Sequence, residues 1–207
     1  MDPQQNPYLP PQAPAAGPAP QQYWADEPIG PTPAAFGIRF LARVLDNVAG
    51  LVLAMITGAM VGFAITIAGI GHVDQKANIA LAFVITTVGS TAYQSIAEGM
   101  GTASIGKLIC GLRVVHQDGY GRPSFGGAVV RNLGYFIDAM FFGVVAAQVM
   151  GGNAMKQRLG DKWGKTVVVH TATLANRASL PSPVMAILLA VFVRMFFTAL
   201  SLAVKIV

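Results

Sequence analysis

The pattern Arg-x-Leu-x-x-x-x-Asp occurs twice in the chain, once from Arg39 to Asp46 and again from Arg131 to Asp138. Each copy opens a run of largely apolar residues of the length that crosses a membrane. The arginine and the aspartate of a copy stand two helical turns apart, about 10 Å along one face of a helix. If the arginine lies at the lipid headgroups, its aspartate lies in the hydrocarbon, where a carboxylate requires a cation, water or a proton.

Two further arginines extend this predicted site. Arg43 precedes Asp46 by three residues on the same helical face, so the spacing favours an ion pair between them. Arg194 stands in the middle of the last apolar segment, where a guanidinium group must be paired, hydrated or drawn to the surface. We expect its partner to be Asp46, Asp138 or a group of another subunit. The predicted polar intramembrane site consists of Arg39, Arg43, Asp46, Arg131, Asp138 and Arg194.

Two interpretations of these charges stay open. Burial raises the pKa of a carboxyl group and a nearby guanidinium lowers it, so a site where the two effects compete could carry a proton. The same ion pairs could instead only lock helices together.

Composition places these charges in a membrane protein. Hydrophobic residues make up 54% of the chain and charged residues 11%, against roughly 25% charged residues in soluble domains. We therefore predict an all-α membrane protein, a polytopic bundle of three or four transmembrane segments that carries a small cytoplasmic loop or ribbon element. The net charge of +5 is interpreted as topology signals and phospholipid contacts, because Lys and Arg flank the apolar runs. No nucleic acid is expected as a partner.

The chain offers no pattern typical of an enzyme. Its single cysteine excludes an internal disulfide and a cysteine-rich metal site, and the three histidines are far apart in the sequence. Nucleophile triads, phosphate loops and zinc motifs are not recognisable. We expect no catalytic residues, no metal and no cofactor.

Apolar runs and proline content predict the boundaries of the parts. Proline and glutamine concentrate in the N-terminal part, a composition that cannot form a packed core. The predicted parts are a disordered tail over 1–34, a membrane domain over 35–170 with spans at about 40–71, 77–97 and 128–150, a linker over 171–182, and an additional transmembrane helix over 183–207.

The charges predict an orientation but leave the third span open. Basic residues before the first span and after the second favour a cytoplasmic N-terminus in a multi-pass protein of a bacterial-type inner (cell) membrane. If 128–150 crosses completely, the four Lys and Arg residues of 156–165 lie outside. If that segment is broken or re-entrant, they return inside, and Thr166–Val169 could pair with Leu112–Val115 as a small cytoplasmic ribbon. Both alternatives remain.

Several motifs occur together in one order along the chain. They are Arg39, Ala42 and Asp46, then Gly106, Lys107, Gly111 and Arg113, then Asp118-Gly119, Arg131-Asn132 and Asp138, and finally Gln157, Arg158, Asp161 and Thr166. Over about residues 36–170 the chain resembles the RDD family of membrane proteins, which is named for one arginine and two aspartates. The resemblance implies that Arg39 and Asp46 are two of these residues and that Asp138, or alternatively Asp161, is the third. It also marks Gly106, Lys107, Gly111, Arg113, Arg158 and Asp161 as family-motif residues.

Two functions are compatible with these features. The resemblance implies transport, which has been suggested for the family, and sodium/proton exchange has been proposed for some members. Asn47 follows Asp46, so no adjacent carboxylate pair is available for a cation. The protein is then a small transporter or an ion- or proton-handling protein that uses intramembrane Asp/Arg pairs. Alternatively it is a membrane scaffold or assembly factor that recruits a cytosolic partner through residues 1–34.

Besides the lipid bilayer, a second copy of the chain is a candidate partner. The pattern Gly58-x-x-x-Gly62 on the first span allows another helix to approach closely. That helix belongs either to the same chain or to another subunit of a homo-oligomer.

Overall fold

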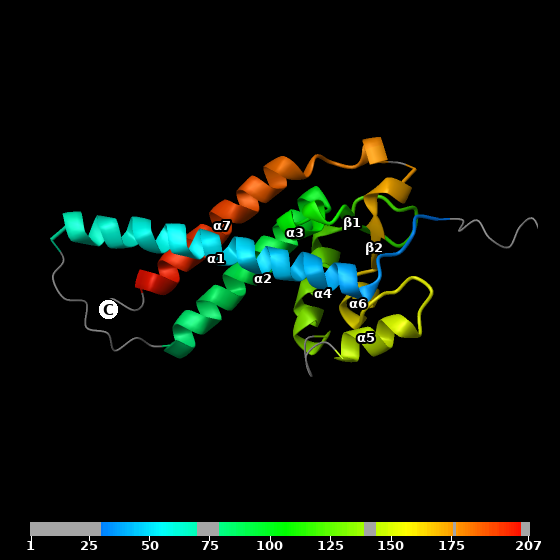
Figure 1. Ribbon diagram of the computed structural model, residues 1–207, viewed down its shortest axis with the longest axis horizontal. Helices are drawn as coiled ribbons and strands as arrows, with labels where there is room; N and C mark the ends of the chain where they lie inside the picture. The colour runs from blue at the N-terminus through cyan, green and yellow to red at the C-terminus, as the bar shows by residue number, and fades with distance from the viewer. Residues whose placement is uncertain (1–29, 70–78, 139–143, 176, 204–207) are drawn as a thin grey trace, which may run out of the picture.

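The computed structural model describes residues 30–69, 79–138, 144–175 and 177–203. Three helices of this part are long and apolar enough to cross a membrane: α1 (Phe36–Ile67), α2 (Ile79–Gly101) and α7 (Pro183–Ala203). They form one end of the molecule, and the short strands and helices gather at the other end (Figure 1). The prediction of a polytopic, mainly helical membrane protein is confirmed.

Helix α1 is longer than a bilayer is thick. Its 32 residues extend about 48 Å, whereas the hydrocarbon core measures about 30 Å. The chain is extended before this helix, at Ala35, after two prolines that disfavour a helix. The uncharged stretch from Asn47 to the end of α1 suffices for the crossing on its own. The charged first turns of α1, which include Arg39 and Asp46, therefore lie at the membrane boundary, where the small elements cover them.

Helices α2 and α7 form an antiparallel pair. The end of α2 meets the start of α7, since a Cβ atom at Gly101 would lie 2.8 Å from the Cβ of Ala186. Near the other ends of the two helices, the Thr86 hydroxyl lies 3.2 Å from the Ser201 hydroxyl. Between these points Tyr93 and Ala190 are buried in one apolar cluster. Helices α1 and α7 thus begin at the end of the molecule where α2 stops.

A two-stranded antiparallel ribbon lies at that end. Strand β1 (Leu112–His116) pairs with β2 (Thr166–His170) in a register that sets Leu112 opposite His170. Runs of valine favour strands, because β-branched side chains pack well on a pleated surface. The ribbon predicted for the returning chain is therefore present.

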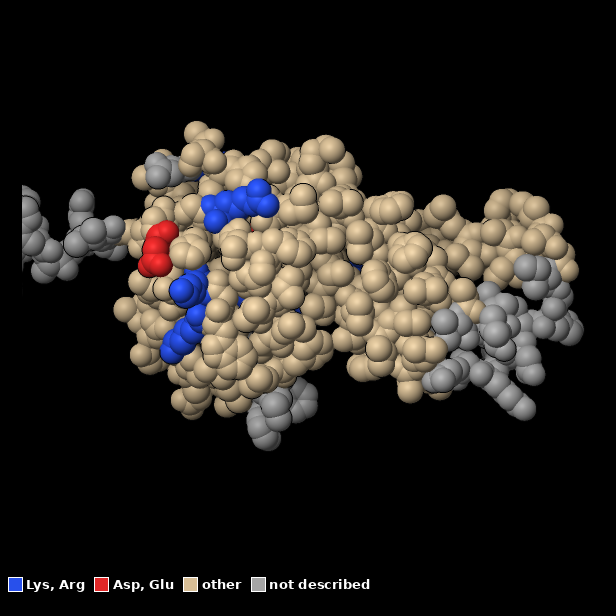
Figure 2. Space-filling model, turned by 180° about the vertical axis from the view of Figure 1, so that it is seen from behind, with Lys and Arg blue, Asp and Glu red and all other residues tan. Residues whose placement is uncertain are grey.

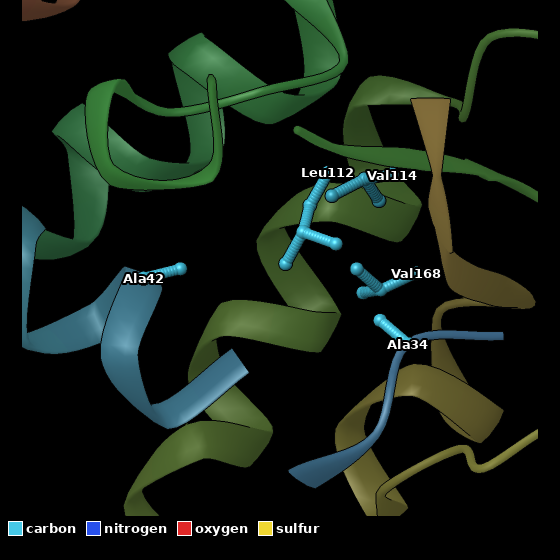
Figure 3. Close-up of a cluster of buried hydrophobic side chains, with 5 residues drawn as sticks. All are labelled: Ala34, Ala42, Leu112, Val114 and Val168. Carbon is cyan, nitrogen blue, oxygen red and sulfur yellow. The ribbon is translucent and has the colours of Figure 1, made fainter. Parts of the chain in front are cut away.

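The start of the described chain joins this ribbon. Pro33 forms a bridge with Val169, and the Ala34 amide donates to the Val168 carbonyl at 2.8 Å. Figure 3 shows Ala34 and Val168 in one buried cluster with Ala42, Leu112 and Val114. This cluster fixes α1 to both strands. Residues 32–34 were predicted to belong to the N-terminal tail, but they are part of the ribbon; residues 1–29 of that tail lie outside the described residues.

The described part of residues 128–150 bears on whether this segment crosses the membrane. The described residues of this segment form α4 (Phe125–Asp138) and α5 (Val144–Gly151), and neither is long enough to span a bilayer. Because β1 and β2 are hydrogen-bonded to each other, the chain between them must return to the end from which it left. The two short helices and the strand pairing favour the broken or re-entrant alternative over a complete crossing.

The remaining elements are short. They are α3 (Ile105–Ile109), α6 (Leu159–Trp163) and two 3-10 turns, Thr171–Thr173 and Arg177–Ser179, in the segment predicted as a linker.

The outer surface fits a lipid environment. Large apolar side chains of the three long helices are exposed, among them Phe63, Ile79 and Met185, which are each about 70% exposed or more. Most charged side chains visible in Figure 2 gather at the ribbon end. A Cβ atom at Gly58 or Gly62 would meet no atom within 4 Å, so the Gly-x-x-x-Gly pattern does not serve close packing among the described helices.

Candidate functional site

Asp161 joins the two copies of the Arg-x-Leu-x-x-x-x-Asp pattern. It lies on α6 and is completely buried. The Arg39 Nη1 atom donates to one of its carboxylate oxygens at 2.7 Å, and the Arg131 Nε atom donates to the other at 2.7 Å. The arginines of both copies, from α1 and α4, therefore hold one carboxylate between them.

Glu98 continues this network at the end of α2. Its Oε2 atom accepts a hydrogen bond from Arg131 Nη1 at 2.7 Å, and its Oε1 atom pairs with the Lys107 ammonium group of α3. Asn132 also donates to Glu98, at 3.3 Å. We call Arg39, Asp161, Arg131, Glu98 and Lys107 the ionic cluster. It connects α1, α6, α4, α2 and α3, which are far apart in the sequence.

Asp161 and Lys107, which lie on the short helices α6 and α3, have shifted pKa values. Burial alone raises the pKa of the Asp161 carboxyl, but Arg131, Arg158 and Arg39 outweigh it and hold this pKa well below its ordinary value. For Lys107, burial lowers the pKa from 10.5 to about 8, against the opposing effect of Glu98. Asp161 is therefore ionised at neutral pH and is fully engaged by guanidinium groups. It is unsuited to binding a cation from solution.

Glycines bring the helices of the ionic cluster together. A Cβ atom at Gly160 on α6 would lie 2.5 Å from the Arg131 carbonyl oxygen of α4, and one at Gly134 would lie 2.6 Å from the Gly160 Cα. On the other side, a Cβ at Gly106 would overlap the Ala42 carbonyl of α1. Only glycine permits these approaches, so Gly106, Gly134 and Gly160 allow the helices to pack this closely. Gly111 follows α3 with φ of 65°, a conformation that glycine adopts without strain.

Asp46 is not paired with Arg43. It is 2% exposed, and it accepts hydrogen bonds from the Ser104 hydroxyl at 2.6 Å and the Gly106 amide at 2.8 Å. The Tyr93 hydroxyl lies 3.4 Å away. The predicted ion pair within α1 is wrong, because the start of α3 approaches Asp46 more closely than the Arg43 side chain does. Asp46 fastens α3 to α1.

Arg43 and Arg194 have aromatic neighbours instead of carboxylates. The Arg43 guanidinium lies 4.0 Å from the centre of the Tyr135 ring, and that of Arg194 lies 5.5 Å from the Tyr93 ring. Arg194 also donates to the Ser90 hydroxyl at 3.2 Å. No carboxylate among the described residues is within ion-pair distance of Arg194, so the expected pairing with Asp46 is wrong. Asp138 ends α4, and its side chain lies outside the described residues.

Three adjoining cavities run from the ionic cluster along the long helices. The first, the charged cavity, measures about 30 Å³ and is lined by Arg39, Arg43, Asp46, Lys107, Arg131, Asn132, Tyr135 and Arg158. The second, the polar cavity, measures about 290 Å³ and shares Arg43, Asn132 and Tyr135 with the first. The third, the inner cavity, measures about 210 Å³ and shares Thr86 and Arg194 with the second. Polar side chains thus follow one another from the ribbon end into the span region.

Five of the six residues predicted for the polar site line these cavities, namely Arg39, Arg43, Asp46, Arg131 and Arg194, whereas Glu98 was not among the predicted residues. The charged partners of Glu98 come from elements that follow later in the chain. A single carboxylate that closes an apolar span, followed by Lys107 and Arg131, was the signal available. Arg113 lies at the edge of the site, where its Nη1 donates to the Gly101 carbonyl at 2.9 Å and caps α2. Arg158 lines the charged cavity and donates its backbone amide to Asp161 at 3.2 Å.

Three apolar helices, a ribbon that closes one end and a buried ionic cluster beneath it define a multi-pass membrane protein. A model of the RDD family matches residues 33–165. The chain therefore belongs to the RDD family, as the motifs indicated. No curated protein and no solved structure matches the chain.

Proposed function

We propose that this protein transports a small polar solute across the membrane. The observation that supports this most directly is the series of cavities between α1, α2, α4 and α7. Polar side chains inside a bilayer are costly and usually mark a pathway or binding site. Here hydroxyl groups of Thr86, Ser90 and Thr198 line the cavities beside Arg194, at a depth where lipid-facing positions are apolar.

In this proposal the ionic cluster is the closed end of the path. Its ion pairs are buried, and they tie the small elements over the charged cavity, whose volume of about 30 Å³ admits one or two water molecules. A solute would require these contacts to open. Cation exchange at Asp161 or Glu98 is disfavoured, since both carboxylates are already held by cationic side chains.

We propose that the ribbon end faces the cytoplasm. The basic residues gather there, and positive charge is retained on the cytoplasmic side of bacterial inner membranes. Three crossings then place the C-terminal end of α7 outside. A cysteine introduced at Ala175, in a Cys110→Ser background, should react with a membrane-impermeant maleimide only after the cells are opened. Labelling in intact cells would show the opposite orientation, with the ribbon end outside.

Transport is tested in proteoliposomes. Vesicles containing the full chain are placed in a hyperosmotic solution of a potassium salt with valinomycin. Because the ionophore carries potassium, the rate of swelling reports entry of the anion. Glycerol and glycine are tested in the same way without the ionophore. Lactate, chloride and phosphate serve as the anions. The proposal expects faster swelling with at least one solute in wild-type vesicles than in Arg194→Gln vesicles. Equal rates in wild-type, variant and protein-free vesicles for every solute would contradict it.

A scaffold function is the second candidate, favoured by the attachment of residues 32–34 to the ribbon. The hydrogen bonds from Ala34 to Val168 and from His170 to Thr32 fix the point at which the preceding proline-rich sequence leaves the membrane domain. Such a fixed exit would present residues 1–29 to a cytosolic protein. Deleting residues 1–29 leaves the ribbon intact, so the scaffold function predicts loss of crosslinked partners with unchanged protein level. Unchanged partner recovery would contradict it.

A further inference from the structure

We propose that the polar cavity binds a small organic carboxylate that also carries a hydroxyl group, with Arg43 and Arg194 facing the carboxylate and Gln94 accepting from the hydroxyl. This names the solute class for the transport function and rests on that proposal, although binding is measured separately from transport.

Gln94 gives the first reason. Its side chain lines the polar cavity and is only 2% exposed, and its Oε1 atom is buried without a hydrogen-bond partner among the described residues. Buried polar groups in native proteins are nearly always paired, so an unpaired acceptor that borders a cavity calls for a donor from a ligand or water. The neighbouring residues of α2 that line the same cavity are Thr91 and Ser90, which are polar as well.

The charges give the second reason. Arg43 and Arg194 both line the polar cavity, and none of its lining residues is a carboxylate. The Arg43 Nε atom is buried without a hydrogen-bond partner in the described part of the chain. Two guanidinium groups beside a cavity in a low-dielectric region favour an anion there.

The wider charge balance agrees with this. The charged cavity is lined by five cationic side chains, namely Arg39, Arg43, Lys107, Arg131 and Arg158, and by Asp46. Adding the buried partners Glu98 and Asp161 gives three carboxylates against five cations, an excess of two positive charges before Arg194 is counted. An anion in the adjoining polar cavity would reduce this excess.

Size and lining select the kind of anion. A volume of about 290 Å³ lies at the lower end of the range for small-molecule sites, which suits an acid of a few carbon atoms. Phe83 and Phe136 supply apolar surface for a carbon skeleton. Chloride has no donor for Gln94, and inorganic phosphate has no apolar part for the phenyl rings. Guanidinium groups match a carboxylate in planar, two-point geometry.

Binding is measured by calorimetry on the full chain in lipid nanodiscs. Four probes isolate the groups involved: lactate has both carboxylate and hydroxyl, propionate lacks the hydroxyl, lactamide lacks the charge, and inorganic phosphate lacks the carbon skeleton. The proposal expects lactate to bind at least about 10-fold more tightly than propionate and phosphate, because a site that pairs a hydroxyl discriminates against analogues without it. It expects no measurable binding of lactamide.

Three variants assign the contacts. Arg194→Gln should weaken lactate binding at least 10-fold, whereas Arg177→Gln, which changes an exposed arginine that does not line the cavity, should leave it unchanged. Gln94→Leu should lower the affinity for lactate to that for propionate and leave the affinity for propionate unchanged. If a cavity variant does not fold, the comparison of the four probes in the wild-type protein still decides the proposal.

Several results would overturn the inference: equal affinity for lactate and propionate, tightest binding of phosphate, measurable binding of lactamide, or equal losses in Arg194→Gln and Arg177→Gln. Its failure can be told apart from failure of the transport proposal. Lactate binding without flux of any solute would leave this site in place and reject transport. Flux of another solute without lactate binding would reject this site and leave transport in place.

Discussion

Replacing Asp161 by Asn tests whether the ionic cluster holds the small elements to the membrane helices. The substitution keeps the shape of the side chain, so no cavity is created. It replaces a carboxylate oxygen by an amide group whose hydrogens face the guanidinium donors of Arg39 or Arg131. Both arginines then remain buried with one negative charge fewer between them.

The magnitude follows from the partners that remain. Breaking a buried ion pair by removing one partner costs about 3–5 kcal/mol. Arg39 keeps two backbone acceptors, the Ala34 carbonyl at 3.0 Å and the Val168 carbonyl at 3.2 Å, and Arg131 keeps Glu98 at 2.7 Å. We therefore expect the lower end, about 3 kcal/mol, which corresponds to a fall in Tm of roughly 6–12 °C for a chain of this size.

Thermal unfolding of the purified protein in nanodiscs measures this effect. Asp118→Asn is the matched control, because Asp118 lies in the turn after β1 with a side chain that is 77% exposed, and such changes usually stay within about 0.5 kcal/mol. Since the pKa of Asp161 is lowered in the folded protein, its contribution is present above its ordinary pKa and is lost only as the pH falls below it. The difference between wild type and Asp161→Asn should thus be constant from pH 8 to pH 5. Equal Tm values for Asp161→Asn and Asp118→Asn would refute the reasoning.

Three further predictions concern neighbouring positions. Gly106→Ala should lower stability by about 1–3 kcal/mol in the same unfolding experiment, because the added methyl group would overlap the α1 backbone; an unchanged Tm would show that α3 can withdraw freely. Lys107 has a pKa of about 8 in the folded protein against 10.5 ordinarily, so the unfolded chain binds more protons between these values and the stability of the wild type rises with pH there. Lys107→Met should abolish this rise in stability with pH. Parallel pH curves for the two proteins would contradict this. Gly50→Ala would set a methyl group against the Arg194 guanidinium, so solute flux should fall several-fold, whereas Gly62→Ala, which meets open space on the same helix, should leave flux unchanged.

The sequence predicts the spanning helices well because length and hydrophobicity determine them. Uncharged runs long enough for the bilayer locate α1, α2 and α7, and the two valine-rich runs locate the ribbon strands. Whether residues 128–150 cross the membrane or return could not be predicted from length and hydrophobicity, since the segment is apolar enough for a crossing. The pairing of β1 with β2, a contact between distant segments, is what favours a return of this segment to the ribbon end.

The sequence could not predict which charged side chains pair with one another. Spacing shows that Arg43 and Asp46 share a helical face, but not that the Gly106 amide, 60 residues from Asp46, takes the carboxylate instead. Arg39 and Asp161 are 122 residues apart and meet only because the ribbon brings α6 back to α1. Composition and spacing thus identified the region of the site, and tertiary packing selected the partners.

The claim on which the transport proposal depends is that water and polar solutes reach the cavities between the membrane helices. Single cysteines at Thr87, Thr198 and Phe192, each in a Cys110→Ser background, measure this in proteoliposomes with a charged, water-soluble thiol reagent. Thr87 and Thr198 line the polar and inner cavities, and Phe192 is 69% exposed on the outer face of α7. We predict rapid reaction at the two cavity positions and none at Phe192. Equal lack of reaction at all three positions would contradict the account.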